Sequence, residues 1–163
     1  MFYKDRPRIK VPYSKKHKII DVLSLLGIVF LIAGPYLYSF FMNDLIPVNF
    51  GDYGKSEAFV IPTVIAVWIS LTLLRVTPHF YNMPVKITAE NAEKQYKIGV
   101  DFIYNLKAGI VLLYIFIQAT PFILLVQKQY RDIDVSRPIP VLAPLLLLFY
   151  FLGEFLYKSI KNK

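Results

Sequence analysis

The chain has 163 residues, of which 56% are apolar and only 18% charged, and its formal net charge is +8. This composition is too apolar and too poor in charge for a typical soluble domain. The chain has no cysteine, which excludes disulfide bridges, thiolate metal sites and a thiol nucleophile.

Residues 1–17 form a basic arm that contains Pro7 and Pro12. The arm shows no apolar periodicity, so we expect irregular structure until a helix begins near His17. Clustered Lys and Arg beside a membrane span are attracted to anionic lipid headgroups. The arm is therefore predicted to lie against the cytoplasmic membrane surface, with docking of a regulator as the alternative.

Four runs of 16 to 22 residues carry no charge: residues 22–43, 58–74, 108–127 and 138–153. About 20 apolar residues in a helix cross the hydrocarbon core of a bilayer. A core helix of a soluble protein would instead need a polar face. The sequence predicts one all-α membrane domain, residues 18–163, in which a bundle of four transmembrane helices spans about 20–43, 58–75, 107–127 and 138–157.

The basic residues are distributed unevenly between the two sides of this predicted bundle. Residues 1–18, residues 75–107 and the C-terminal tail hold 15 of the 19 Lys and Arg residues. Short loops rich in Lys and Arg remain in the cytoplasm, so both termini are predicted to be cytoplasmic. The same asymmetry explains the net charge better than nucleic-acid binding does. Close helix contacts are expected at small residues: Gly27, Gly34, Ala66, Gly109 and Gly153.

The first outer loop, residues 44–57, combines one proline and two glycines with charged and amide side chains. Asn49, Asp52 and Lys55 bring hydrogen-bond donors and acceptors to the outer membrane face. A solvated turn explains these residues as structure. As function, they are the best candidates for contact with a molecule outside the cell.

Residues 75–107 form the longest predicted region outside the bilayer. Thr88 is predicted to cap a helix that begins near Ala89. An apolar stripe at spacings of three and four marks this helix as amphipathic: Ala92, Tyr96, Gly99, Ile103 and Leu106. We expect a cytoplasmic helix that lies along the inner membrane interface or dips into it before the third span, with a helix that runs straight into that span as the alternative.

Two segments resemble the SdpI-like family, a bacterial membrane domain named for an immunity protein against a secreted peptide toxin. Residues 46–50 and 54–55 are similar to a shortened form of the family's first loop, and residues 82–96 are similar to a second family segment. The second segment includes Asn82, Pro84, Thr88, Asn91 and Tyr96. Asn49 stands where the family usually has histidine, so a titrating or metal-binding role of that histidine does not carry over.

Signals for catalysis are weak. The two histidines, His17 and His79, have no second histidine or paired carboxylate at metal-ligand spacing. No glycine-rich phosphate loop and no nucleophile elbow is present. We therefore expect no catalytic residues, metal or cofactor, and both histidines are predicted to be solvated at the cytoplasmic interface.

Ionisable and polar residues at membrane depth are candidates for function because their burial in lipid is costly. Asp21 and Glu154 lie near the predicted inner ends of their spans, where Arg75, Lys107 or Lys158 can pair with them. Pro35 and Pro121 each remove a helical N–H, which leaves the carbonyl groups of Leu31 and Ile117 unpaired. Gln118 is the nearby polar side chain that can satisfy such a carbonyl or line a polar cavity.

The sequence therefore predicts a non-enzymatic protein of the bacterial cytoplasmic (inner) membrane. The resemblance implies immunity to a peptide toxin outside the cell or its sensing, with a cytoplasmic regulator inside. The alternatives are a small transporter built around Gln118 and an accessory subunit of a membrane complex. A pore would require an oligomer, because four spans are too few for a wide monomeric lumen.

Overall fold

The computed structural model describes residues 6–42, 50–129 and 139–163, with side chains described over 6–34, 60–119 and 142–163. These residues form α1 (Lys15–Met42), α2 (Phe50–Leu74), the short 3-10 helix η1 (Pro78–Phe80), α3 (Ala92–Gln129) and α4 (Ile139–Lys161). No strand occurs in these ranges. The predicted all-α class and the presence of four long helices are confirmed.

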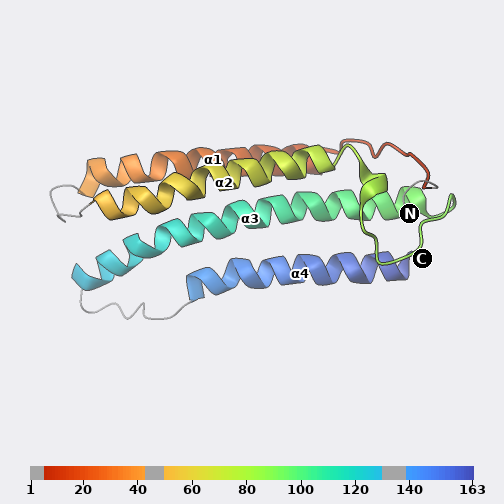
Figure 1. The fold of residues 1–163 in the computed structure, drawn as a ribbon. Coiled ribbons are helices and arrows are strands. Elements are labelled where there is room, and N and C mark those ends of the chain that lie inside the picture. Colours follow the sequence, from red (N-terminus) through yellow and green to blue (C-terminus); the bar gives the residue numbers. More distant parts are fainter. Residues whose placement is uncertain (1–5, 43–49, 130–138) are drawn as a thin grey trace.

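Successive long helices run in opposite directions, so the N-terminus, η1 and the C-terminus lie at one end of the molecule (Figure 1). We call this end, where α1 and α3 begin and α2 and α4 finish, the terminal end. In the described residues α3 packs against α1, α2 and α4, whereas α4 packs on α3 rather than on α1 or α2. The long central helix α3 therefore holds the assembly together.

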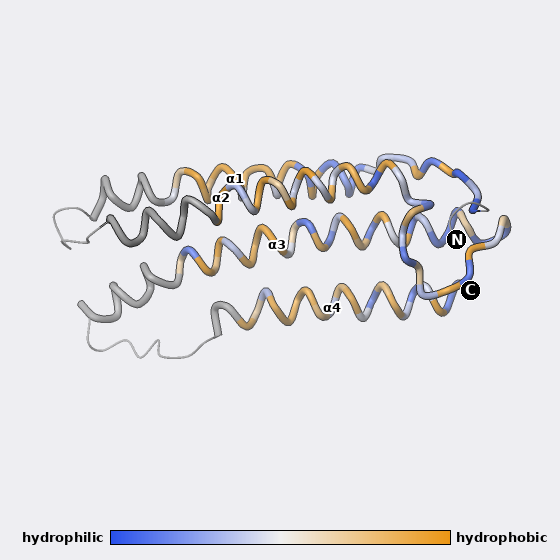
Figure 2. The backbone as a smooth tube through the Cα atoms, in the orientation of Figure 1, coloured by the Kyte–Doolittle hydropathy of each residue, from blue (hydrophilic) through white to orange (hydrophobic). Residues whose placement is uncertain are grey.

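Three helices, α1, α3 and α4, are long and apolar enough to cross a membrane. Large apolar side chains project outward from α1 and α4, including Phe30 at 52%, Leu146 at 67% and Phe149 at 68% exposure. In the coloured part of the helices, apolar residues predominate away from the terminal end, while hydrophilic residues gather at that end (Figure 2). Such exposed apolar faces suit lipid as the surrounding solvent. In the part with described side chains, the apolar stretch of α2, Val60–Leu74, is shorter.

One sequence-based expectation about helix boundaries is wrong. Residues 50–57 belong to α2, although the sequence suggested a loop through residue 57. The segment contains no proline, and charged residues do not end a helix that leaves the hydrocarbon. The amphipathic segment is not a separate helix before the third span. It is the first part of α3, which runs on through Pro121 to Gln129, the alternative that the sequence left open.

An extended strap, residues 81–88, crosses the terminal end before α3. Burial alternates along it: Met83, Val85 and Ile87 are buried, whereas the residues between them are exposed. These three side chains pack with Ala92 and Tyr96 of α3. Ile9 and Val11 of the N-terminal arm cover the same cluster, so the arm and the strap share one small core outside the helix bundle.

The central core joins α1, α2 and α3 through four buried side chains: Ile28, Leu31, Val64 and Val111. Gly27 allows this approach, because a β-carbon there would lie 2.5 Å from Val111 Cγ1. Gly109 similarly faces Leu148 of α4. These two contacts confirm the expected role of small residues. Ala66 and Gly153 are exposed, and a β-carbon on Gly153 would meet nothing within 4 Å, so their expected packing role is wrong.

Replacing Gly27 with alanine is expected to destabilise the fold by about 1–3 kcal/mol, because Val111 branches at its own β-carbon and has little freedom to move away. Thermal unfolding in mild detergent measures the effect. The double variant Gly27→Ala/Val111→Ala should regain part of the loss. Gly153→Ala is the matched control and should equal or exceed the parent in stability, since alanine favours helix. A Gly27→Ala variant as stable as Gly153→Ala would contradict this packing.

Candidate functional site

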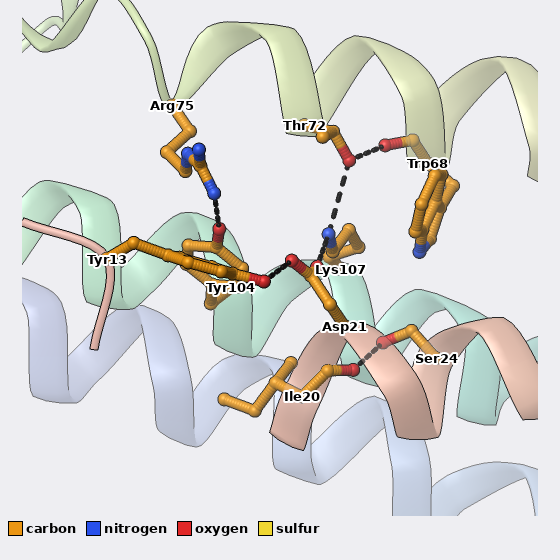
Figure 3. Close-up of polar contacts among 9 residues, drawn as sticks. All are labelled: Tyr13, Ile20, Asp21, Ser24, Trp68, Thr72, Arg75, Tyr104 and Lys107. Atoms are coloured by element: carbon orange, nitrogen blue, oxygen red, sulfur yellow. Dashed lines mark hydrogen bonds and ion pairs between the residues drawn. The ribbon is translucent and has the colours of Figure 1, made fainter. Parts of the chain in front are cut away.

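A cluster of polar side chains lies between α1, α2 and α3 near the terminal end (Figure 3). We call it the polar cluster; it contains Tyr13, His17, Asp21, Thr72, Arg75, Asp101, Tyr104 and Lys107. Each helix contributes residues at spacings of three or four, which places them on one helix face. The stripes are His17 and Asp21 in α1, Thr72 and Arg75 across the end of α2, and Asp101, Tyr104 and Lys107 in α3.

Lys107 is the most deeply buried charge of the cluster, at 1% exposure. Its ammonium pairs with Asp21 and donates a hydrogen bond to Thr72 Oγ1 at 3.2 Å. The Thr72 hydroxyl donates its own hydrogen to the carbonyl oxygen of Trp68. A lone pair of Thr72 Oγ1 therefore remains to accept the hydrogen bond from the ammonium. The Nζ atom also lies 4.5 Å from the centre of the Trp68 ring and 4.9 Å from that of Tyr104, both within cation–π range. One ammonium thus links all three helices.

Asp21 connects this ion pair to the N-terminal arm. Its second carboxylate oxygen accepts a hydrogen bond from the hydroxyl of Tyr13 at 2.7 Å. This bond is the main reason that the pKa of Tyr13 is raised to about 12, because the neutral phenol is the form that donates. Arg75 lies 4.5 Å from the centre of the Tyr13 ring and donates to the Tyr104 hydroxyl at 2.6 Å.

His17 is buried at 2% exposure, so the expectation that it would be solvated is wrong. Its ring stacks on Tyr104 with centroids 4.2 Å apart, which shields it from solvent. Nδ1 accepts a hydrogen bond from the Ser14 backbone N–H, and Nε2 lies 2.7 Å from Asp101 Oδ1. We assign the neutral tautomer with hydrogen on Nε2, because Nδ1 acts as an acceptor. In this tautomer His17 donates a hydrogen bond to Asp101 without neutralising its charge.

The ion pairs expected for Asp21 and Glu154 are confirmed. Asp21 pairs with Lys107, and Glu154 pairs with Lys158 one turn further along α4 at 2.5 Å. In the second pair about half of the Lys158 side chain is exposed. Exposed pairs of this kind within one helix stabilise the helix by only a few tenths of a kcal/mol. The two pairs therefore differ in kind, since only the first is enclosed by other helices.

Gln118 meets the carbonyl group that Pro35 leaves unpaired. Its Nε2 donates to the Leu31 carbonyl oxygen at 3.0 Å, as the proline pattern predicted. Gly34 makes room for this contact, because a β-carbon there would lie 3.2 Å from the same nitrogen. The other amide atom, Oε1, is buried without a hydrogen-bond partner among the described residues. Gln118 thus replaces the backbone hydrogen bond that α1 lacks at Pro35.

Residues 82–96 have structural roles in their middle, at Thr88, and at their end, at Tyr96. The Thr88 hydroxyl accepts from the Asn91 N–H, and the Asn91 side chain accepts from the Thr88 N–H. This reciprocal pair caps the turn at residues 88–91, and α3 begins after it at Ala92 rather than near Ala89 as predicted. Tyr96 is fully buried against the strap, whereas Asn82 and Pro84 are exposed.

The outer-loop candidates are only partly described. Asp52 and Lys55 lie in the first two turns of α2, and their side chains are outside the described set. Asn49 lies outside the described residues altogether. Their proximity to one another is therefore a prediction from sequence alone.

Sequence reasoning named Lys107, together with Arg75 and Lys158, among the possible partners of Asp21. It missed the other members of the polar cluster: Tyr13, His17, Thr72, Asp101 and Tyr104. The spacing of polar residues on three separate helices was the available signal. In the described residues, no group of three or more His, Cys, Asp or Glu side chains is placed to hold a metal ion. The donors and acceptors of the polar cluster mainly satisfy one another, an arrangement that fixes helices rather than activating a substrate.

Comparisons with known proteins give no family: no protein-family model, curated protein or solved structure matches this chain.

Removing either partner of the Lys107–Asp21 pair is expected to cost about 3 kcal/mol, because the remaining charge is left buried and unpaired. We expect Lys107→Met and Asp21→Leu each to lower the unfolding temperature in detergent. The double variant should be more stable than either single variant, since both charges are then gone. Glu154→Gln, at the half-exposed pair, is the control and should change little. Additive losses in the double variant would contradict the pairing.

Proposed function

We propose that the protein crosses the bacterial cytoplasmic membrane four times, with both termini in the cytoplasm. All three basic segments meet at the terminal end, which agrees with the preference of Lys and Arg for the cytoplasmic side. The fourth span is α2, whose uncharged residues 58–74 cover roughly 26 Å as a helix. The polar cluster then lies at the inner edge of the hydrocarbon, where charged groups cost less than at the centre.

The absence of native cysteine makes this topology directly testable with single introduced cysteines. In right-side-out vesicles, an impermeant thiol reagent should label Lys55→Cys and Arg131→Cys. It should label Lys10→Cys, Lys86→Cys and Asn162→Cys only after the membrane is opened. Labelling of Lys86→Cys and Asn162→Cys from opposite sides would mean an odd number of crossings between them and would overturn the four-span topology.

We further propose that the protein is non-enzymatic and acts as SdpI-like proteins do, in immunity to or sensing of a secreted peptide toxin. The observation that carries this proposal is the continuity of α3. The helix has 38 residues, roughly 57 Å, and begins directly after the family-like strap. It also contacts each of the other long helices. A displacement of the bundle at the outer end would therefore reach the strap through one continuous helix.

In this mechanism a toxin meets the outer side near Asn49, Asp52 and Lys55, and α3 shifts against its neighbours. The exposed strap residues Asn82 and Pro84, together with Lys86, present the changed surface to a cytoplasmic regulator. The capping box at Thr88 and the buried Tyr96 keep the strap coupled to α3. The resemblance of residues 82–96 supports the choice of this segment.

Cells with and without the protein can be challenged with medium from the source strain and its relatives, with survival and membrane potential as readouts. We expect specific protection, and we expect the triple variant Asn49→Ala/Asp52→Ala/Lys55→Ala to lose it. The triple variant Glu93→Ala/Asn162→Ala/Lys163→Ala is the matched control, because it removes the same classes of side chain at exposed positions of the terminal end. Equal protection by both variants would remove the outer loop from the mechanism. No protection against any medium would contradict immunity.

The transporter alternative depends on a free polar side chain within the bundle. The amide nitrogen of Gln118 is engaged by the Leu31 carbonyl, whereas its Oε1 has no hydrogen-bond partner among the described residues and is the one polar atom that this side chain leaves for a solute. Solute or ion flux in reconstituted vesicles would favour it, whereas a stable partner that survives mild detergent would favour an accessory subunit.

A further inference from the structure

A polar groove opens between α3 and α4 near the terminal end, with the first turn of α1 at its edge. Its enclosed part measures about 20 Å³, room for about one water molecule, and the rest of the groove is open to its surroundings. A bound group would therefore lie along the open groove rather than inside a closed pocket. The polar lining consists of Lys16, Asp101, Asn105, Glu154 and Lys158.

The lining combines two cations with two anions. Glu154 and Lys158 pair across one helical turn and remain partly exposed, at 27% and 53% of their side chains. The charge of Asp101 is not neutralised by His17, because that imidazole is the neutral donor in their hydrogen bond. Within the described residues, the side chains of Lys16 and Asn105 have no ion pair or hydrogen bond. The groove thus offers both signs of charge and unused hydrogen-bonding groups.

The apolar side of the groove is aromatic. Phe102 of α3 and Phe155 of α4 line it and stack on each other, with centroids 4.6 Å apart. The groove also lies at the edge of the apolar band. Lys16 precedes the uncharged run of α1, Asn105 precedes that of α3, and Lys158 follows that of α4. Lipid headgroups occupy this depth in a bilayer, directly above their acyl chains.

We propose that this groove binds the headgroup of a zwitterionic aminophospholipid. Lys16 and Lys158 are placed to bind the phosphate, Asp101 and Glu154 to bind the ammonium, and Asn105 to complete the hydrogen bonding. A purely anionic lipid is disfavoured, because two carboxylates repel it as strongly as two ammonium groups attract it. The proposal is independent of any role in immunity and depends only on the protein lying in a bilayer.

Native mass spectrometry of the full chain in detergent, mixed with equal amounts of phosphatidylethanolamine and phosphatidylglycerol, tests this site. The parent is expected to retain phosphatidylethanolamine preferentially. Glu154→Gln and Asp101→Asn should each lower that retention about tenfold, the effect of losing one charged hydrogen bond. Asp101→Asn preserves an acceptor for His17, so its fold is maintained. Lys158→Gln should lower retention of both lipids.

The control is Glu93→Gln/Lys163→Gln, which removes one charge of each sign at exposed positions outside the groove and should bind as the parent does. Free phosphoethanolamine and inorganic phosphate serve as competitors. If phosphoethanolamine competes and inorganic phosphate does not, the headgroup alone suffices for binding. If neither compound competes, and Glu154→Gln still loses retention of phosphatidylethanolamine, the acyl chains are also needed. Equal retention of both lipids by the parent, or loss in the control as large as in Glu154→Gln, would overturn the proposal.

Discussion

A lysine ammonium that is almost completely removed from solvent must be paired, because an isolated charge in a low-dielectric environment costs several kcal/mol. Lys107 meets this requirement with groups from three helices: the carboxylate of Asp21 in α1, the hydroxyl of Thr72 in α2 and the ring of Tyr104 in α3 itself. Each of these groups lies at a fixed height along its helix. Pairing Lys107 therefore fixes the register of the three helices against one another.

In a membrane, this constraint matters more than it does in water. Apolar side chains gain little by leaving lipid for the protein interior, so hydrophobic burial does not set helix positions strongly. Polar contacts and close packing at small residues must do so instead. The structure uses both, with the polar cluster near the terminal end and Gly27 against Val111 further along the bundle. Gln118 adds a polar contact beyond that, where it satisfies the Leu31 carbonyl.

The terminal end is also where the non-helical parts of the chain are held. Arg6 donates to the carbonyl oxygen of Tyr81 at 2.5 Å, and Gln95 donates to the carbonyl groups of Ser159 and Asn162 at 2.9 Å. The arm, the strap and the end of α4 are thus all anchored close to the start of α3. Any change in the position of α3 therefore alters the surface that these segments form, which is the physical basis of the proposed relay.

The sequence by itself determined the all-α class, the long apolar helices, the capping role of Thr88 and the need of Asp21 for a cationic partner, because each depends on local composition, periodicity or a charge that needs a partner. It also indicated that Gln118 could bind the carbonyl group that Pro35 leaves unpaired. Only the tertiary structure decided that Lys107 is the partner of Asp21, that α3 lies at the centre of the bundle, that His17 is buried against Tyr104, and that Asp101 and Glu154 line the same groove. The reason is that these features depend on how helices rotate and pack against one another. Residues far apart in the chain meet there, and no local pattern specifies such a meeting.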